Sequence, residues 1–386
     1  MRPAFRGILV IDRAYLTLLI GPTIPAPAPQ VVIDSLMSVQ VTIASDQRSG
    51  FQLVFSLSRD STVLRVMHPA GYFDPNIRVI IIMTVNGLPN VLMDGLIIRQ
   101  EFSPSNDLGK STLTVTGEDV SLAMSLNEIM SNGTPFPIPE NLRVMAILAK
   151  YMIYGLIPAV FPPPFPDQPI PTEKMPAQQG SDLDYINALA KLVGYVFYII
   201  PGPLPGMNTA YWGPEIRIGI PQPALNINMD AHSNVESLSF SLDGSSREQM
   251  AIMIQEPITK LSIPIPLPDI SLLSPPLAVR QAPALRYKEL KGAAKLDPLK
   301  AMSHALGAAS KSADAVTASG QLDVLRYGRV LQARQLVGVR GAGLAYDGLY
   351  YVKSVTHNIN CRTGEFKQNF QMARNGLVSI TPAVVP

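Results

Sequence analysis

Cysteine, histidine and tryptophan are scarce in this 386-residue chain, and their scarcity excludes several classes of protein. The single cysteine, Cys361, rules out an internal disulfide framework and fits synthesis in a reducing cytoplasm. None of the four histidines has a second His or Cys at metal-ligand spacing. The sequence therefore predicts no metal site, no cofactor and no catalytic thiol.

Charged residues are also few. They make up 16% of the chain and leave a formal net charge of +2 at pH 7. Nucleic-acid binding relies on clustered Lys and Arg, so no nucleic-acid partner is predicted. The apolar fraction of 47% argues against general disorder. A neutral surface is typical of a subunit covered by neighbours, although large β-cores give the same composition.

Long uninterrupted apolar runs are missing as well. An apolar stretch near the N-terminus is cut by Asp12 and Arg13 before it reaches the length of a signal-peptide core. The most membrane-like stretch, 144–161, contains Lys150 and Pro158 and fits a buried helix better than a membrane span. We therefore expect a soluble chain without a cleaved secretion signal.

The most informative feature that is present is a pattern that occurs twice. The first copy covers 94–102 and 109–117, and the second covers 347–355 and 364–372. Each has an Asp-Gly turn, a β-rich run, a polar loop and a second run that alternates at period two, as β-hairpins do. Two related β-units are predicted, with chance resemblance between two hairpins as the alternative.

Alternation gives each hairpin two faces. The apolar face is predicted to fill a barrel, and the polar face to line a central channel or contact the adjoining barrel. The expected core residues are Leu113, Val115, Phe366, Phe370 and Met372. The candidate channel or inter-barrel residues are Thr112, Thr114, Thr116, Lys367, Asn369 and Gln371.

Further strands are expected around both hairpins. Runs at 38–43, 51–57 and 77–85 would complete the first unit, and runs at 215–220 and 235–242 would contribute to the second. Closure of such short antiparallel strands into barrels removes exposed edges.

Three helices are predicted between the units. Asp119 is expected to cap the first, which stops near residue 132; Pro139 opens the second, and Ser181 caps the third. A buried strand at 195–200 should follow. Pro-rich connectors are expected at 162–176 and 257–283, and a helix or mobile arm at 297–320.

Two local patterns suggest chemistry, and both have a simpler explanation. The run 108–112 resembles the end of a phosphate-binding loop, but Pro104 stands where that motif needs glycine. Glu118 and Asp119 could serve hydrolysis, yet helix capping explains Asp119. No catalytic residue is predicted, and a carboxylate pair assembled in space stays open.

Four segments resemble the phage late control D proteins, the family of the baseplate hubs of contractile phage tails and of the hub portion of type VI secretion spike proteins. The similarity extends over about 30–376, with 257–320 poorly matched. No single motif is strongly specific, and the resemblance depends on the order and spacing of the segments together. The segments are 113–119, 178–190, 211–214 and 347–357.

The resemblance implies a mainly β fold with α/β insertions, in which two tube-like antiparallel β-barrels per chain are joined by small helical subdomains. It implies a structural, non-enzymatic baseplate hub of a phage tail or contractile injection system, synthesised in the bacterial cytoplasm. This hub is a homotrimer that adapts the sixfold inner tube, built of hexameric rings, to a threefold spike. The chain stops shortly after Met372, so a separate trimeric spike protein and other baseplate components are expected partners.

The alternatives are a tail-associated peptidoglycan hydrolase and a carbohydrate-binding tail protein. The expected division of the chain is an N-terminal extension (1–29), a first barrel (30–118), a helical or α+β subdomain (119–205), a second barrel (206–245 and 321–378), an insertion (246–320) and a C-terminal tail (379–386).

Overall fold

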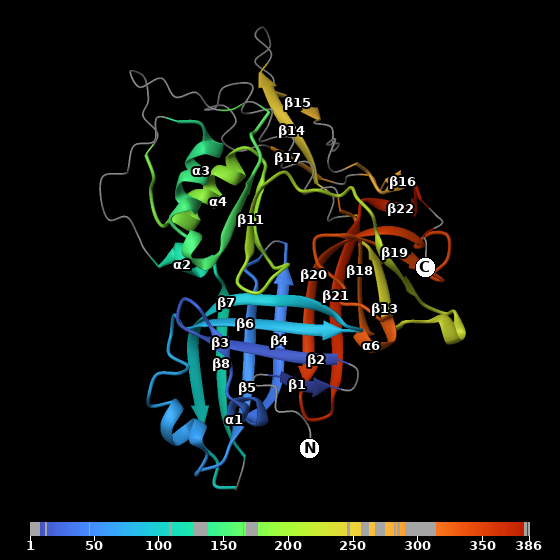
Figure 1. Cartoon of the computed structure of the whole chain (residues 1–386). Helices are drawn as coiled ribbons and strands as arrows, with labels where there is room; N and C mark the ends of the chain where they lie inside the picture. The colour runs from blue at the N-terminus through green and yellow to red at the C-terminus, as the bar shows by residue number, and fades with distance from the viewer. Residues whose placement is uncertain are drawn as a thin grey trace.

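The computed structural model confirms a mainly β fold, built on one large curled antiparallel sheet with a few small helices (Figure 1). Fourteen strands belong to this sheet, whose main path runs β1-β2-β6-β7-β8-β5-β4-β20-β21-β18-β13. The structure describes residue 384 and residues 8–381, except 12–13, 46, 108–109, 127–137, 165, 167–176, 245–247, 256–261, 267–274, 282, 284–285 and 290–313.

The first unit occupies the N-terminal part of the sheet. Its strands alternate buried and half-buried residues, as a sheet with one face on a core requires. Its elements are β1 (Ile8–Ile11), β2 (Ala14–Gly21), β3 (Ala26–Pro27), α1 (Gln30–Ser35), β4 (Leu36–Ala44), β5 (Gly50–Leu57), the short π-helical segment η1 (Val63–Met67), β6 (Arg78–Val85), β7 (Leu88–Ser103) and β8 (Ser111–Asp119).

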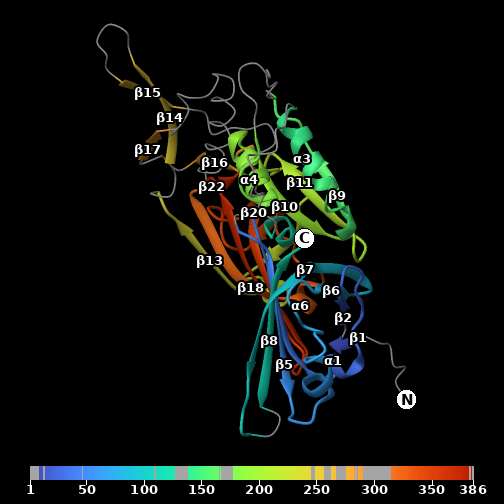
Figure 2. The same cartoon turned by 90° about the vertical axis from the view of Figure 1, so that its left-hand side faces the viewer.

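A helical subdomain follows, with its own core around the fully buried Trp212. The prediction of Ser181 as a helix cap is confirmed, because its Oγ accepts a hydrogen bond from the Asp184 N–H at 3.1 Å. The elements are α2 (Leu122–Ser125), α3 (Glu140–Ala149), η2 (Met152–Tyr154), β9 (Leu156–Val160), α4 (Asp182–Leu192), β10 (Val196–Pro201) and β11 (Asn208–Gly213). Figure 2 shows α3 and α4 at the opposite end of the molecule from the tip of the long β5 and β8 strands.

The second unit forms the other half of the sheet and carries smaller sheets at its margin. Its elements are β12 (Gln222–Asn226), η3 (Asp230–His232), β13 (Val235–Leu242), β18 (Val316–Asp323), α6 (Val324–Tyr327), β19 (Leu336–Arg340), β20 (Gly348–Asn360) and β21 (Glu365–Arg374). The margin contains β14 (Glu248–Gln255), β15 (Ser262–Pro266) and β17 (Arg286–Glu289) in one sheet, and β16 (Ala278–Gln281) with β22 (Gly376–Ser379) in another.

Both units thread their strands in the same way, so the predicted repeat is confirmed. In chain order the first five-strand set is β4, β5, β6, β7, β8, and it is arranged in space as β6-β7-β8-β5-β4. The second set is β13, β18, β19, β20, β21, arranged as β19-β20-β21-β18-β13. β-Bulges fall at matching places, between Ile97 and Arg99 in β7 and between Val352 and Ser354 in β20.

The bulges give a residue-by-residue correspondence between the units. Arg99 of β7 matches Ser354 of β20, and Thr116 of β8 matches Gln371 of β21. The Asp-Gly pairs that first suggested the repeat are not equivalent, because Asp94 lies two residues out of step with Asp347 in this alignment. Asp94 and the glycine after it lie inside β7 and make no turn, which corrects the sequence interpretation.

Several expected boundaries differ from the structure. Residues 14–21, assigned to an N-terminal extension, form β2 and pair with β6. Residues 316–320, assigned to the insertion, begin β18. The segment 215–220 is not a strand. The backbone of these residues does not pair with a neighbouring strand, and β12 begins at Gln222.

The first predicted helix is shorter than expected. Asp119 ends β8, and its carboxylate accepts a hydrogen bond from the Ser121 N–H at 2.9 Å, so it shapes the turn before α2 without capping it. The second predicted helix is present as α3, and Pro139, expected in its first turn, lies at the N-cap position one residue before it. The expected helix stop at 132, most of both Pro-rich connectors and most of the arm at 297–320 lie outside the described residues.

Candidate functional site

The two units meet edge to edge at a ladder between β4 and β20. Residues 38–44 pair antiparallel with 354–360, and the Ser45 N–H donates to the Lys353 carbonyl at 2.9 Å. Side chains bond across the ladder as well: the Thr42 and Thr356 hydroxyls lie 3.2 Å apart. The joint therefore makes one continuous sheet from two repeats.

Polar side chains form a row across this joint. Directly opposed partners on successive strands share a face of a sheet. The Thr116 position of β8 opposes Gln52, Gln52 opposes Gln40, Gln40 opposes Asn358, and Asn358 opposes Lys367 of β21. The predicted polar residues of both hairpins therefore lie on a single face, which we call the polar face.

An apolar row alternates with it on the opposite side of the sheet. Val115, Leu53, Val39, Ile359 and Phe366 oppose one another in the same order and are at most 1% exposed. All five predicted core residues lie in the same buried cluster. They are Leu113, Val115, Phe366, Phe370 and Met372.

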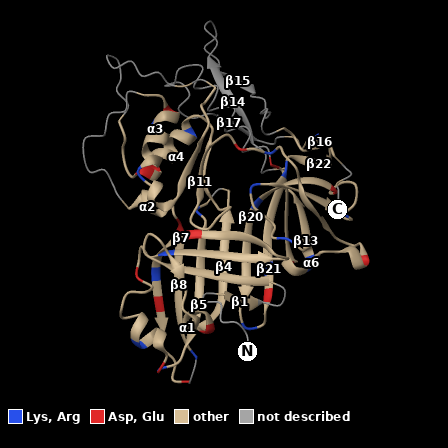
Figure 3. Ribbon diagram, in the orientation of Figure 1, with Lys and Arg blue, Asp and Glu red and all other residues tan. Residues whose placement is uncertain are grey.

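The polar face is mostly uncharged. Thr112, Thr114, Thr116 and Lys367 are half-buried, whereas Asn369 and Gln371 are exposed. The Gln321 amide donates to Asn369 at 2.9 Å, and Lys367 pairs with Glu236 at 2.9 Å. The middle stretches of β4, β5 and β21 carry no charged residues in Figure 3. A surface of hydroxyls and amides offers few places where a charged or apolar molecule would adhere.

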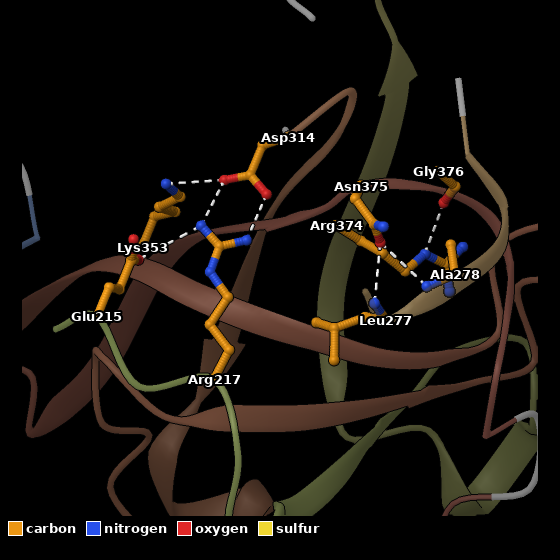
Figure 4. A network of polar contacts seen from close by, with 9 residues as sticks. All are labelled: Glu215, Arg217, Leu277, Ala278, Asp314, Lys353, Arg374, Asn375 and Gly376. Carbon is orange, nitrogen blue, oxygen red and sulfur yellow. Dashed lines mark hydrogen bonds and ion pairs between the residues drawn. The ribbon is translucent and has the colours of Figure 1, made fainter. Parts of the chain in front are cut away.

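A buried ionic network fastens the connector that leads into the second unit (Figure 4). Arg217 is 4% exposed, donates to Asp314 at 2.9 Å and lies 4.9 Å from the Tyr351 ring centroid. Lys353 reaches the same carboxylate at 2.8 Å. Burial alone would raise the pKa of Asp314, but the two cations outweigh it and lower that pKa.

The chain end of the second unit is tied down beside this network (Figure 4). The Asn375 side-chain oxygen accepts from the N–H groups of Leu277 and Ala278, both at 3.0 Å. The fully buried Arg374 donates to the Gly376 carbonyl at 2.8 Å. These bonds hold the strand pair β16–β22 against the sheet.

A second buried ion pair joins the first unit to the helical subdomain. Arg78 of β6 makes two hydrogen bonds to Asp94 of β7, at 2.8 and 2.7 Å. The Asn208 amide of β11 donates to the same carboxylate at 2.7 Å, and Arg78 also donates to the Tyr154 carbonyl at 2.8 Å. The Asp of the first Asp-Gly pair thus has a structural role that the sequence alone did not suggest.

The structure places the titratable side chains that the sequence singled out. No cluster of three His, Cys, Asp or Glu side chains that could hold a metal occurs among them. Burial raises the pKa of Cys361 to about 12 and lowers that of His357 to about 3, so both are neutral at pH 7. Burial also raises the pKa of Asp119, while its neighbour Glu118 turns to Arg48 at 3.0 Å.

No helix in the described part of the chain is long and apolar enough to cross a membrane.

Sequence reasoning found the polar face of each hairpin but missed the joint between them. The signal was present in the alternation of Ser38, Gln40 and Thr42 and in that of Thr356 and Asn358. Nothing in those runs shows that β4 pairs with a strand 314 residues away along the chain.

The fold of the chain is similar to those of solved tail proteins. A tail protein of Neisseria meningitidis MC58 is similar with a TM-score of 0.61 at 12% identity, covering 97% of this chain and 99% of the other. The 43 kDa tail protein of prophage MuSo2 from Shewanella oneidensis gives 0.61 at 12% identity, with 93% and 98% covered.

A chain of the half-lidded PdpA-VgrG complex of Francisella gives a TM-score of 0.54 at 7% identity, covering 98% of this chain and 61% of that one. No protein-family model matches the sequence, and no curated protein matches it. At these identities the likeness is one of fold: the chain has the fold of phage tail proteins.

Proposed function

We propose that this protein is a structural, non-enzymatic hub of a phage tail or contractile injection system, working as a homotrimer that adapts a sixfold inner tube to a threefold spike. The observation that carries the proposal is the pair of β-units with identical strand order, joined through β4 and β20. Three chains supply six such units around one axis, which is what a hexameric tube ring needs as a docking surface.

The elements that occur once per chain would supply the threefold character. Among the residues that the structure describes, the helical subdomain and the marginal sheets of the second unit have no counterpart in the first unit. Three copies of them would form a threefold surface for a separate trimeric spike protein and other baseplate components. The fold shared with tail proteins supports this assignment.

The polar face would line the central channel of the ring. Its threonine, asparagine and glutamine side chains give a wall to which passing cargo does not adhere, with Thr112, Thr114 and Thr116 contributed by one unit and Lys367, Asn369 and Gln371 by the other. The protein would be made in the bacterial cytoplasm and incorporated into the particle there.

The test is reconstitution with the inner-tube and spike proteins of the same particle, followed by electron cryomicroscopy without imposed symmetry. We expect three copies of this chain in one ring, with the tube on one side and the spike on the other. A different copy number, or a complex that excludes the tube protein, would contradict the proposal.

A further inference from the structure

The edge of β20 that pairs with β4 can be compared with the corresponding edge of β7 in the first unit. In the second unit, β20 is long: its first half pairs with β19, and the outer edge of its second half receives β4 from the other unit. The equivalent strand β7 is built in the same way, with its first half paired to β6. Among the described residues, the outer edge of its second half, 98–103, has no strand on it.

The strand that would fill this edge is also present. β13 is the counterpart of β4, since both carry a bulge one residue after their start, at Glu236 and Met37 respectively. β4 is paired on both edges, but β13 ends the sheet and pairs only with β18 within the described part of the chain. Among the described residues, the second half of β7 therefore has a free edge, and β13, the counterpart of the strand that fills the equivalent edge of β20, has one free edge of its own.

Apolar side chains of β7 and β13 are more exposed than their counterparts in β20 and β4, as expected if a neighbouring copy covers them in the assembly. Ile98 is 42% and Phe102 is 37% exposed in β7. Their counterparts are Lys353, which is half-buried at the end of the β4–β20 ladder, and His357, which is 1% exposed within it. Leu242 of β13 is 45% exposed, while its counterpart Ile43 in β4 is half-buried. Unpaired strands with apolar side chains are liable to pair with another chain.

We propose that β13 of one copy adds to the outer edge of the second half of β7 in the next copy, in the register of the β4–β20 ladder. This inference rests on the proposed trimeric ring and specifies how its subunits join. The correspondence gives the pairs directly: Arg99 opposes Asp243, Glu101 opposes Ser241, Phe102 opposes Phe240 and Ser103 opposes Ser239.

The side chains suit this register. Because the Ser45 N–H bonds to the Lys353 carbonyl, the Thr42–Thr356 pair is of the non-hydrogen-bonded kind, whose Cα atoms are about 4.5 Å apart. The pairs Glu101–Ser241 and Arg99–Asp243 inherit that geometry. Arg99 already bonds Glu101 at 2.8 Å on the exposed edge, and the register brings the Asp243 carboxylate opposite it. One register thus aligns opposite charges and brings two phenylalanines together.

Cysteine cross-linking tests the register. In a Cys361→Ser background, Glu101→Cys with Ser241→Cys should form a disulfide between copies, because antiparallel partners at this spacing match disulfide geometry. Six strands separate β7 from β13 within a chain, so the link must be intermolecular. Under mild oxidation of the trimer we expect the band on a non-reducing gel to shift from monomer to covalent trimer.

Two matched pairs control the experiment. Thr42→Cys with Thr356→Cys is the equivalent pair inside the chain, with hydroxyls 3.2 Å apart, and should link without changing the oligomer on the gel. Glu101→Cys with Ser237→Cys keeps the same face but moves the partner four residues, about 13 Å along the strand, and should not link.

The outcomes separate this inference from the proposed function. A trimer by light scattering that links at 101–237 or at neither pair, while 42–356 links, overturns the register and leaves the trimeric hub standing. A protein that stays monomeric in the presence of the tube and spike proteins overturns both. Linking at 101–241 with no link at 101–237 supports the proposed ladder.

Discussion

The buried Arg78–Asp94 pair should be a main determinant of how firmly the first unit holds the helical subdomain. The two side chains are 4% and 0% exposed, and Asp94 also accepts from Asn208. Asp94→Asn removes the negative charge and places an amide NH₂ where Arg78 or Asn208 presents a donor. Breaking a buried pair by removing one partner costs about 3–5 kcal/mol of unfolding free energy.

Urea unfolding followed by the fluorescence of the single tryptophan measures this loss. Trp212 is fully buried in the core of the helical subdomain, so it reports the unit that the pair anchors. With an m-value of about 2 kcal/mol/M, the midpoint should fall by about 1.5–2.5 M. The matched control is Asp107→Asn, whose exposed partner Lys110 lies 2.8 Å away and contributes at most about 1 kcal/mol. Equal midpoint shifts in the two variants would refute the reasoning.

Three further predictions concern the core, the pH dependence and the assembly. Phe370→Ala should lower the unfolding free energy by about 3–5 kcal/mol in urea titrations, whereas the exposed neighbour change Asn369→Ala should stay within about 0.5 kcal/mol. Burial lowers the pKa of His357 from 6.5 to about 3, so the unfolded chain binds a proton that the folded chain lacks between those values. Stability should therefore fall as the pH drops below about 6.5, by at most about 1.4 kcal/mol per pH unit, and His357→Gln should reduce that slope in melting curves. Co-assembly with tube protein should survive high salt, because only 16% of residues are charged, and dissociation at moderate salt in sedimentation would contradict this.

The sequence predicted the parts of the fold that are local. Period-two alternation identified the two faces of β8 and β21, and the Ser181 cap and first-turn carboxylates identified α4. These features depend on neighbours within a few residues. The same local reasoning misread Asp94, because an Asp-Gly pair favours a turn by propensity, while the buried Arg78 holds it inside a strand.

The arrangement of the units was beyond local reasoning. The β4–β20 ladder joins segments whose separation leaves no pattern in either run, and it follows from the sheet topology instead. Local alternation predicted the polar residues of each hairpin, but it did not predict that they share a face. Thr116 and Lys367 are on one face because Gln52, Gln40 and Asn358 lie between them on successive strands.

The long separation of β4 and β20 along the chain also means that the two strands are synthesised at different times. Thr42 leaves the ribosome 314 residues before Thr356, an interval of about 15–60 s at 5–20 residues per second. Throughout that time β4 can pair with β5 on one edge but has no β20 for the other, as β13 pairs on one edge only among the described residues. A nascent or truncated chain that ends before β20 therefore exposes an unpaired edge of β4, which resembles the β13 edge that is proposed to join the copies. Shielding of this edge until β20 emerges would avoid premature pairing of such chains.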